Sequence, residues 1–251
     1  MYYIDNTTYM LYTLAMEISF SLPDQVLPFL KNKADGYYLA GGTALSMFYY
    51  QHRESFDLDF FTQTFSSEQV LKISRNLEKD SGWQVELLSE QNRENLIRVA
   101  IYLVHIGDEK KCKIDFVEDY VPLIHPLKRV DGVDILSLED IYLRKIYAIA
   151  GHVPALNEIG QKVMLGGRQV AKDFYDIYCL STITMPLSEF VSRHCNNAVQ
   201  EGVVRWYRTY DRTDMKLGLL GLVTANEPDF RLIEAHFKKE IDKLLETLIG
   251  G

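Results

Sequence analysis

The sequence predicts an α+β protein, in which a small mixed sheet with flanking helices is followed by an all-helical C-terminal half. Two patterns carry this prediction. Up to about residue 118, short runs alternate apolar and polar residues with the period of two that is typical of strands. After residue 136 the apolar residues recur at helical spacing, and the strand pattern nearly disappears. We therefore expect an α+β unit over residues 1–135 and a helical unit over residues 136–251, in a chain long enough to bury a large core.

The first unit is expected to open with a helix and then to mix strands with helices. Pro23 and Pro28 interrupt the opening helical pattern. The last two strands are joined through Gly107 and Asp108, a pair typical of hairpin loops. In chain order, the expected elements are a loose helix over residues 10–31, a strand over 37–40, a helix over 43–50, a strand over 56–61, a helix over 66–79 and strands over 83–88, 96–105 and 111–118.

The second unit begins with a helix-start signal. Ser137 and Asp140 fit a capping box, in which side chains at both positions satisfy free N–H groups of the first turn. The helix that follows is expected to end near Gly151. Further helices are expected over residues 170–180, 187–200, 203–211, 214–223 and 229–249.

Charge and composition narrow the classes of function. The chain has 27 Lys and Arg residues against 35 Asp and Glu residues, a formal net charge of −8, which disfavours a general polyanion-binding surface. The three cysteines show no metal-binding spacing. We find neither a signal peptide nor an apolar run long enough to span a membrane. The expectation is a cytoplasmic protein that does not bind membranes.

Asp57 and Asp59 form a D-x-D pair on a predicted strand. Side chains at i and i+2 of a strand point to the same face, so the two carboxylates should converge. Like charges this close favour a cation between them, and hard oxygen ligands suit Mg²⁺ or Mn²⁺. The alternative is an ordinary solvated strand face.

Gly41, Gly42 and Thr43 stand between the preceding strand and helix. Glycines let a ligand approach the backbone, and free N–H groups at a helix start can hold phosphate. Because this turn precedes the D-x-D strand, a phosphate cradle and metal carboxylates would face the same end of adjacent strands. Asp115, a lone acid between Ile114 and Phe116 on a later strand, would complete a two-metal centre. Alternatively, Asp115 is an exposed residue at the end of its strand.

These motifs resemble those of the AbiEii/AbiGii-type toxin nucleotidyltransferases, in the polymerase-β-like nucleotidyltransferase superfamily. The resemblance rests on the run GGTAL at residues 41–45, HRESFDLDFF at 52–61, Asp115, RKIYAIAG at 144–151 and KDFYDIY at 172–178. It implies a polymerase-β-like nucleotidyltransferase core over 1–135, with the helical domain over 136–251 completing the active-site cleft.

The resemblance also implies a role for each matched residue. Asp57, Asp59 and Asp115 would hold Mg²⁺ or Mn²⁺, with Asp115 activating the attacking hydroxyl, and Lys145 would be the catalytic, nucleotide-binding lysine. The NTP-binding residues that it implies are Gly41, Gly42, Thr43, Ser55, Lys145, Lys172 and Asp176.

Each residue outside the carboxylate set also has an ordinary structural explanation. Lys172 and Asp176 stand at i and i+4 of a predicted helix, where a surface ion pair is common. Lys145 could be a solvated helix residue. His52 and Arg53 could either compensate a helix dipole or line the rim of the pocket. Residues 152–171 form a longer connection than such proteins usually have, with Arg168 as the arginine that would match the family's loop.

The leading functional hypothesis is a Mg²⁺-dependent nucleotidyltransferase that transfers a nucleotidyl group from an NTP to an acceptor hydroxyl and releases pyrophosphate. The resemblance implies a toxin of an abortive-infection or toxin–antitoxin pair, with tRNA or another RNA as acceptor and a cognate antitoxin as partner. Two alternatives stay open: nucleotidylation of a small molecule or protein, which the acidic charge favours over long RNA, and a non-catalytic module that binds NTP or a partner.

Overall fold

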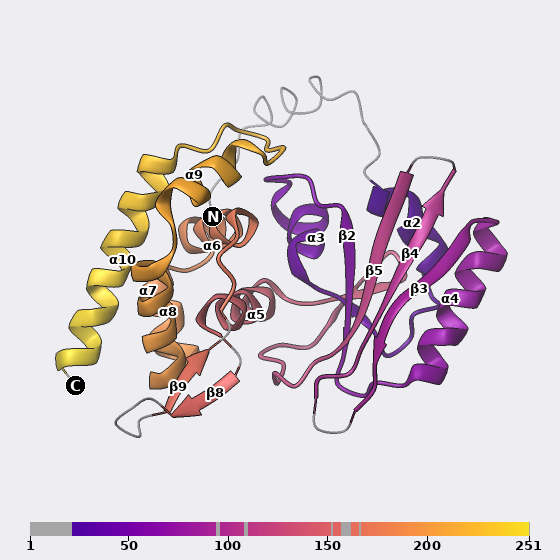
Figure 1. Ribbon diagram of the computed structural model, residues 1–251, viewed down its shortest axis with the longest axis horizontal. Helices are drawn as coiled ribbons and strands as arrows, with labels where there is room; N and C mark the ends of the chain where they lie inside the picture. Colours follow the sequence, from indigo (N-terminus) through magenta and orange to yellow (C-terminus); the bar gives the residue numbers. More distant parts are fainter. Residues whose placement is uncertain are drawn as a thin grey trace, which may run out of the picture.

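The computed structural model describes residues 22–93, 96–107, 110–151, 153–156, 162–165 and 167–250. Within these residues the sheet and the helices occupy two sides of the molecule (Figure 1). Strands β1–β7 form one mixed sheet, and helices α5–α10 gather beside one of its faces. No helix in the described residues is both long enough and apolar enough to cross a membrane.

The sheet has the strand order β3-β4-β5-β2-β1-β7-β6. Its neighbours β2 and β5 run parallel, as do β1 and β7, whereas the other pairs are antiparallel. The strands are β1 (Tyr38–Leu39), β2 (Asp57–Thr62), β3 (Gln84–Gln91), β4 (Val99–Ile106), β5 (Lys110–Glu118), β6 (Lys128–Val130) and β7 (Val133–Ile135). The expected α+β class is confirmed.

Helices α2 (Leu22–Leu30) and α4 (Ser67–Ser81) cover one face of this sheet (Figure 1). The alternation of β2 and β5 sends Leu58, Phe60, Ile114 and Phe116 to that face, where they are fully buried. Removing such apolar surface from water is the main favourable term for folding. The opposite face of the same two strands carries the acidic residues and looks toward the helical half.

The helical half packs around aromatic side chains. Phe174 contacts Phe237 at a ring-centroid distance of 4.8 Å, and Tyr142 stacks on Phe190 at 4.0 Å. Such pairs add packing specificity to the burial of large apolar surfaces. The elements are α5 (Leu138–Ala150), β8 (Val153–Leu156), β9 (Lys162–Leu165), α6 (Ala171–Ile183), α7 (Leu187–His194), α8 (Asn197–Thr209), α9 (Arg212–Leu220) and α10 (Phe230–Gly250).

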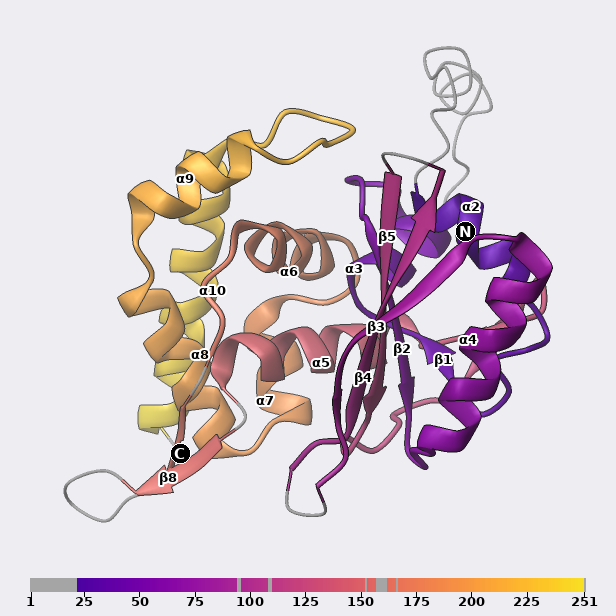
Figure 2. The ribbon, with the colours of Figure 1, turned by 45° about the vertical axis from the view of Figure 1, so that its right-hand side comes forward.

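Among the described residues, the chain before α5 and a backbone pairing after α9 are two of the places where the halves meet. The first is the chain itself, because α5 begins directly after β7. The predicted cap at this helix start is confirmed: Asp140 N donates to Ser137 Oγ over 3.1 Å. The segment before β2 also pairs with the loop after α9: Glu54 N donates to Val223 O over 2.8 Å. Figure 2 shows α5 and α6 lying between the sheet and the outer helices.

The predicted glycine turn was wrong in one respect. Helix α3 (Gly41–Leu45) starts at the glycines rather than after them, and a π-helical segment η1 (Ser46–Tyr50) continues it. Gly41 has a φ of +68°, which glycine adopts without strain. The opening helix was also different, because both prolines lie inside α2. Residues 10–21 of that expected helix are outside the described part of the chain, as is Asp108 of the expected hairpin loop.

Helix boundaries in the second half also needed correction. The expected helix over 187–200 is broken at Cys195, and Asn196 caps a new helix by accepting from Val199 N over 3.1 Å. The apolar pattern stays periodic across this break and so does not reveal it. Asn196 could have revealed it, because Asn is a preferred N-cap residue and marks the start of a new helix.

Two hairpins were not predicted. The β6–β7 turn has Asp131 and Gly132 at φ values of +50° and +79°, the Asp-Gly signature of a tight hairpin. The β8–β9 hairpin contradicts the expectation of an all-helical second half, and it lies inside the long connection over 152–171. Strands of three or four residues are too short to show a reliable alternation, which is why the pattern missed them.

Candidate active site

A cavity of about 370 Å³ lies between the acidic face of the sheet and helix α5. The two halves of the chain both contribute to its wall. From the first half come Gly41, Gly42, Arg53, Ser55, Asp57, Asp59, Lys113, Asp115, Asp119 and Tyr120, and from the second Arg144, Lys145, Tyr147, Arg168, Lys172 and Asp173, among others.

Strand register brings the carboxylates together. In the parallel β2–β5 pair, Asp59 is opposite Asp115 and Asp57 is opposite Lys113. Because side chains alternate along each strand, all four point to the cavity face. Lys113 Nζ lies 2.6 Å from Asp115 Oδ2 and 4.0 Å from Asp57 Oδ2.

The carboxylate cluster is short of positive charge. Burial raises the pKa of Asp59, and the neighbouring Asp115 and Asp57 raise it further, while Lys145 and Lys113 oppose the shift. Asp115 Oδ1 is buried and has no hydrogen-bond partner among the described residues. In that part of the chain no three acidic, His or Cys side chains are already arranged around a common metal position. The cluster is thus suited to receive a cation, but its side chains have to adjust to bind one.

The glycine pair lies against this cluster. A Cβ at Gly41 would come within 2.4 Å of Asp59 Oδ2, and one at Gly42 within 2.2 Å of Arg53 Nη2. No side chain fits at either position without moving these charged groups. The cavity wall at the start of α3 is therefore bare backbone.

A buried ion network backs the other wall. Lys145 Nζ on α5 lies 2.7 Å from Asp173 Oδ1 and 2.6 Å from Asp176 Oδ2 on α6. The Asp176 carboxylate, which is fully buried, also accepts from Arg53 Nε over 2.6 Å and lies 2.7 Å from His52 Nε2. Burial alone would raise the pKa of Asp176, but Lys145, His52 and Arg53 together hold it well below its usual range. Likewise burial would lower the pKa of Lys145, but Asp176 and Asp173 raise it above its ordinary value.

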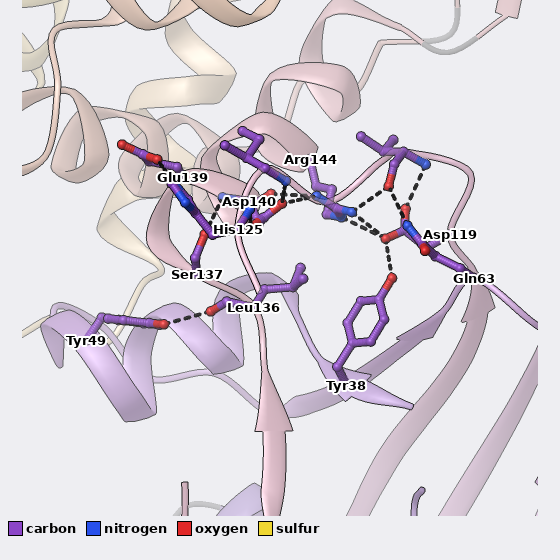
Figure 3. A network of polar contacts seen from close by, with 12 residues as sticks. Tyr38, Tyr49, Gln63, Asp119, His125, Leu136, Ser137, Glu139, Asp140 and Arg144 are labelled. Carbon is purple, nitrogen blue, oxygen red and sulfur yellow. Dashed lines mark hydrogen bonds and ion pairs between the residues drawn. The ribbon is translucent and has the colours of Figure 1, made fainter. Parts of the chain in front are cut away.

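Arg144, the neighbour of Lys145, fixes α5 to the sheet (Figure 3). Its Nε donates to Asp119 Oδ2 over 2.9 Å, and its Nη1 donates to Asp140 Oδ1 over 3.2 Å. Tyr38 on β1 donates to the same Asp119 oxygen over 2.6 Å. Because Arg144 and both acids are nearly buried, this network holds the helix that carries Lys145 at a set position over the sheet.

The structure brings most of the predicted site residues into the cavity wall. Asp57, Asp59, Asp115, Lys145, Gly41, Gly42, Ser55 and Lys172 line it, as does Arg168, whose half-exposed guanidinium lies 3.1 Å from Asp173 Oδ2. Lys172 is exposed at the rim. Asp176 does not form the surface ion pair with Lys172 that the sequence allowed, because its carboxylate is buried and contacts His52, Arg53 and Lys145 instead.

Thr43 and Asp176 are not part of the cavity wall. Both are fully buried behind it, which contradicts direct contact of their side chains with an NTP. The Thr43 hydroxyl donates to the backbone carbonyl of Asp57 and lies 2.7 Å from Ser55 Oγ. Thr43 therefore positions the D-x-D strand, and Asp176 positions Lys145 and Arg53.

Sequence reasoning missed Lys113, Tyr120 and the bridging role of Arg144. Lys113 stands two residues before Asp115, so strand alternation alone could have placed it on the same face. Tyr120 is 54% exposed at the cavity mouth and follows the end of β5. No local pattern marks it, because only the tertiary structure brings that loop opposite α5.

We expect Gly41→Ala to damage the site more than an ordinary Gly→Ala change damages a protein. The new Cβ meets Asp59 Oδ2 at 2.4 Å, and the positive φ adds about 1 kcal/mol of backbone strain. Calorimetry with Mn²⁺ should show weaker binding, and a thermal melt should show a small loss of stability. Gly82→Ala is the control, because Gly82 has a similar φ of +70° but open space around its Cβ. Equal effects of the two variants on Mn²⁺ binding would contradict the predicted contact.

Known proteins resemble this chain over most of its length. An uncharacterized protein (aq_aa25) of Aquifex aeolicus is 29% identical over 222 residues, covering 84% of this chain and 89% of the relative. The MenT4 nucleotidyltransferase toxin from Mycobacterium tuberculosis has a similar structure, with a TM-score of 0.54 and 16% identity over 90% of this chain and 80% of that chain. The structure of JHP933 from Helicobacter pylori is also similar, with a TM-score of 0.52 and 19% identity over 92% of this chain and 97% of that chain.

These structural similarities support the polymerase-β-like fold that the motifs imply. The family model described as the nucleotidyl transferase AbiEii toxin of type IV toxin–antitoxin systems matches residues 29–249, which include every site residue discussed above. The chain therefore belongs to the AbiEii family of nucleotidyltransferase toxins.

Proposed function

We propose that this nucleotidyltransferase uses Mg²⁺ or Mn²⁺ to transfer a nucleotidyl group from an NTP to an acceptor hydroxyl, with release of pyrophosphate. The observation that carries the proposal is a single cavity that combines three acidic side chains, a bare glycine backbone and the buried ammonium of Lys145. We also propose that residues 1–135 act as the catalytic core and residues 136–251 as the domain that completes the cleft.

Asp57, Asp59 and Asp115 are the residues that would hold the divalent ion. Their fit rests on two features: burial and then repulsion from Asp115 and Asp57 raise the pKa of Asp59, and Asp115 Oδ1 lacks a hydrogen-bond partner in the described part of the chain. When bound, Mg²⁺ would neutralise triphosphate charge and polarise the phosphorus–oxygen bonds.

The triphosphate is placed by backbone and cations. Gly41 and Gly42 let phosphate oxygens approach the main chain, and Ser55 adds a hydroxyl at the same wall. Among the described contacts, Lys145 gives two of its three donor directions to Asp173 and Asp176, which leaves the third for a phosphate. Lys172 adds an exposed charge at the rim.

For transfer, the acceptor oxygen bonds to the α-phosphorus as the bond to the bridging oxygen breaks and pyrophosphate leaves. Asp115 takes the proton of the acceptor hydroxyl, because it faces the cavity from the strand beside Asp57 and Asp59. The buried ion network keeps Lys145 in place through this step.

We propose an RNA, with tRNA as the first candidate, as the acceptor, and a cognate antitoxin as the partner. Membership of a family described as toxins of type IV toxin–antitoxin systems supports the antitoxin partner. The net charge of −8 requires RNA contacts to be confined to a local cationic region. Arg168 and Lys172 at the cavity rim supply one.

Incubation of the protein with each labelled NTP, Mg²⁺ and total tRNA tests the proposal. Label transferred to tRNA is the expected result. Label on a protein or on a small molecule would contradict the proposed RNA acceptor but would still support nucleotidyl transfer. NTP binding without any transfer would overturn the proposed reaction and favour a non-catalytic binding module.

Lys172→Ala is expected to raise the KM for NTP by roughly tenfold with little change in kcat. An exposed rim lysine contributes one charge-assisted phosphate contact, and that contact is made equally in the ground state and in the transition state. Steady-state kinetics measure the effect. Lys216→Ala, an exposed lysine on α9, removes the same charge away from the cavity and should leave KM unchanged. A KM for Lys172→Ala equal to that of the control would remove Lys172 from the NTP site.

A further inference from the structure

Lys113 has an unusual position for a strand residue, because its ammonium lies inside the carboxylate cluster. This position has two causes. The register of the β2–β5 pair places Lys113 opposite Asp57, and Lys113 stands two residues before Asp115 on β5, so both side chains lie on the same face. The Lys113 Nζ lies 2.6 Å from Asp115 Oδ2 and 4.0 Å from Asp57 Oδ2. One cation thus contacts two of the three acidic side chains that would bind the metal.

The other nearby ammonium is engaged elsewhere. Lys145 Nζ is held by Asp173 and Asp176 at 2.7 and 2.6 Å. Lys145 lowers the pKa of Asp59 from a distance, by more than Lys113 does, but among the described residues its ammonium forms no ion pair with Asp57, Asp59 or Asp115. Within the described residues, Lys113 is therefore the lysine that contacts the carboxylate cluster directly, through Asp115 and Asp57. Its side chain is 35% exposed, so it has room to turn away into the cavity.

We propose that Lys113 is a displaceable internal cation, which occupies the metal position of the Asp57–Asp59–Asp115 cluster before the divalent ion binds and leaves Asp115 when it arrives. This inference rests on the proposed function, since it needs a divalent ion at that cluster. Lys113 is a positioning residue: it acts through the carboxylates and does not touch the reacting atoms.

Two consequences follow from competition for the same oxygens. In the metal-free protein, Lys113 relieves the repulsion among three carboxylates that strand register forces together. For the same reason it lowers the affinity for a divalent ion alone, because the ion has to break the Lys113–Asp115 contact. Removing the lysine should therefore weaken the metal-free protein and strengthen metal binding, a pair of opposite effects that a merely structural ion pair does not produce.

Mn²⁺ binding without nucleotide, measured by calorimetry on the full chain, tests the proposal. We expect Lys113→Met to bind Mn²⁺ roughly tenfold more tightly than the wild type. Lys113→Arg keeps the charge and should not gain affinity. Lys111→Met is the matched control: Lys111 is exposed on the same strand and face, about 6.6 Å further along, so it loses the same charge outside the cluster.

Thermal melts give a second readout. Lys113→Met should melt below the wild type in the presence of a chelator, and saturating Mn²⁺ should raise its Tm by more than it raises that of the wild type. Equal Mn²⁺ affinity of Lys113→Met and the wild type, or an equal gain in Lys111→Met, would overturn the proposal.

A lysine-acylation experiment on the wild type keeps the proposal testable should Lys113→Met fail to fold. Mn²⁺ should increase the acylation of Lys113 and leave that of Lys111 unchanged; no change at Lys113 would overturn the proposal.

The displacement proposal and the proposed function fail in different ways. A wild type that binds Mn²⁺ and transfers nucleotides, with no gain in Lys113→Met, refutes only the displacement. Absence of Mn²⁺ binding in both proteins refutes the metal cluster itself.

Discussion

The double variant Asp57→Asn, Asp59→Asn is expected to lose nucleotidyl transfer by about 10³-fold or more while keeping its fold. Divalent-ion chemistry contributes several kcal/mol to such a reaction, and each 1.36 kcal/mol corresponds to tenfold in rate. Both carboxylates line the cavity beside the glycine pair, so their loss removes two of the three expected ligands. Single-turnover kinetics with labelled NTP measure the effect.

Stability of this variant should be unchanged or slightly higher without metal. Burial and the neighbouring acids raise the pKa of Asp59, which means that its charged form is disfavoured in the folded protein. The matched control is Glu86→Gln, Glu90→Gln, which removes two charges from the exposed strand β3 of the same sheet. Retention of more than a tenth of wild-type activity by the aspartate variant, with normal activity in the control, would exclude these two residues from the metal site.

Asp176→Asn is expected to lower the free energy of unfolding by about 3–5 kcal/mol, the usual cost of removing one partner from a buried ion network. Asp176 has no exposed surface and contacts Lys145, Arg53 and His52. The substitution leaves two buried cations with fewer counter-charges, although Asp173 still contacts Lys145. Denaturant unfolding measures the change.

Asp242→Asn provides the comparison for Asp176→Asn. Asp242 forms an ion pair with Lys238 on the surface of α10, where both side chains are more than half exposed. An exposed pair contributes roughly 0–1 kcal/mol, so this control should differ little from the wild type. A loss of stability in Asp176→Asn no larger than in the control would mean that the network does not stabilise the fold.

The same network predicts a pH dependence. Burial raises the pKa of Asp176, but Lys145, His52 and Arg53 lower it well below its usual range, so the folded protein favours the charged carboxylate more than the unfolded chain does. Its contribution is therefore fully present above the unfolded carboxyl pKa of about 3.9, and it is lost as the pH falls through the lowered folded value. Unfolding free energies measured from pH 7 to pH 3 should fall less steeply for Asp176→Asn than for the wild type.

Local patterns in the sequence determined much of the carboxylate side of the site. The period of two in a strand is set by the backbone alone, so Asp57 and Asp59 had to share a face. Ser137 and Asp140 likewise marked the start of α5, because a capping box involves residues only three apart. The resemblance to the family predicted that Asp115 and Lys145 belong to the same site, and both line the cavity.

Only the tertiary structure decided which charged groups contact one another. Thr43 and Asp176 have the right residue types for ligand binding, but packing buries them behind the wall, where they support other residues. Lys113 meets Asp57 only because β5 pairs with β2 in one register, and a shift of one residue would send it to the opposite face. The Lys113–Asp57 and Arg53–Asp176 contacts join residues more than fifty positions apart, and no local periodicity in the sequence records them.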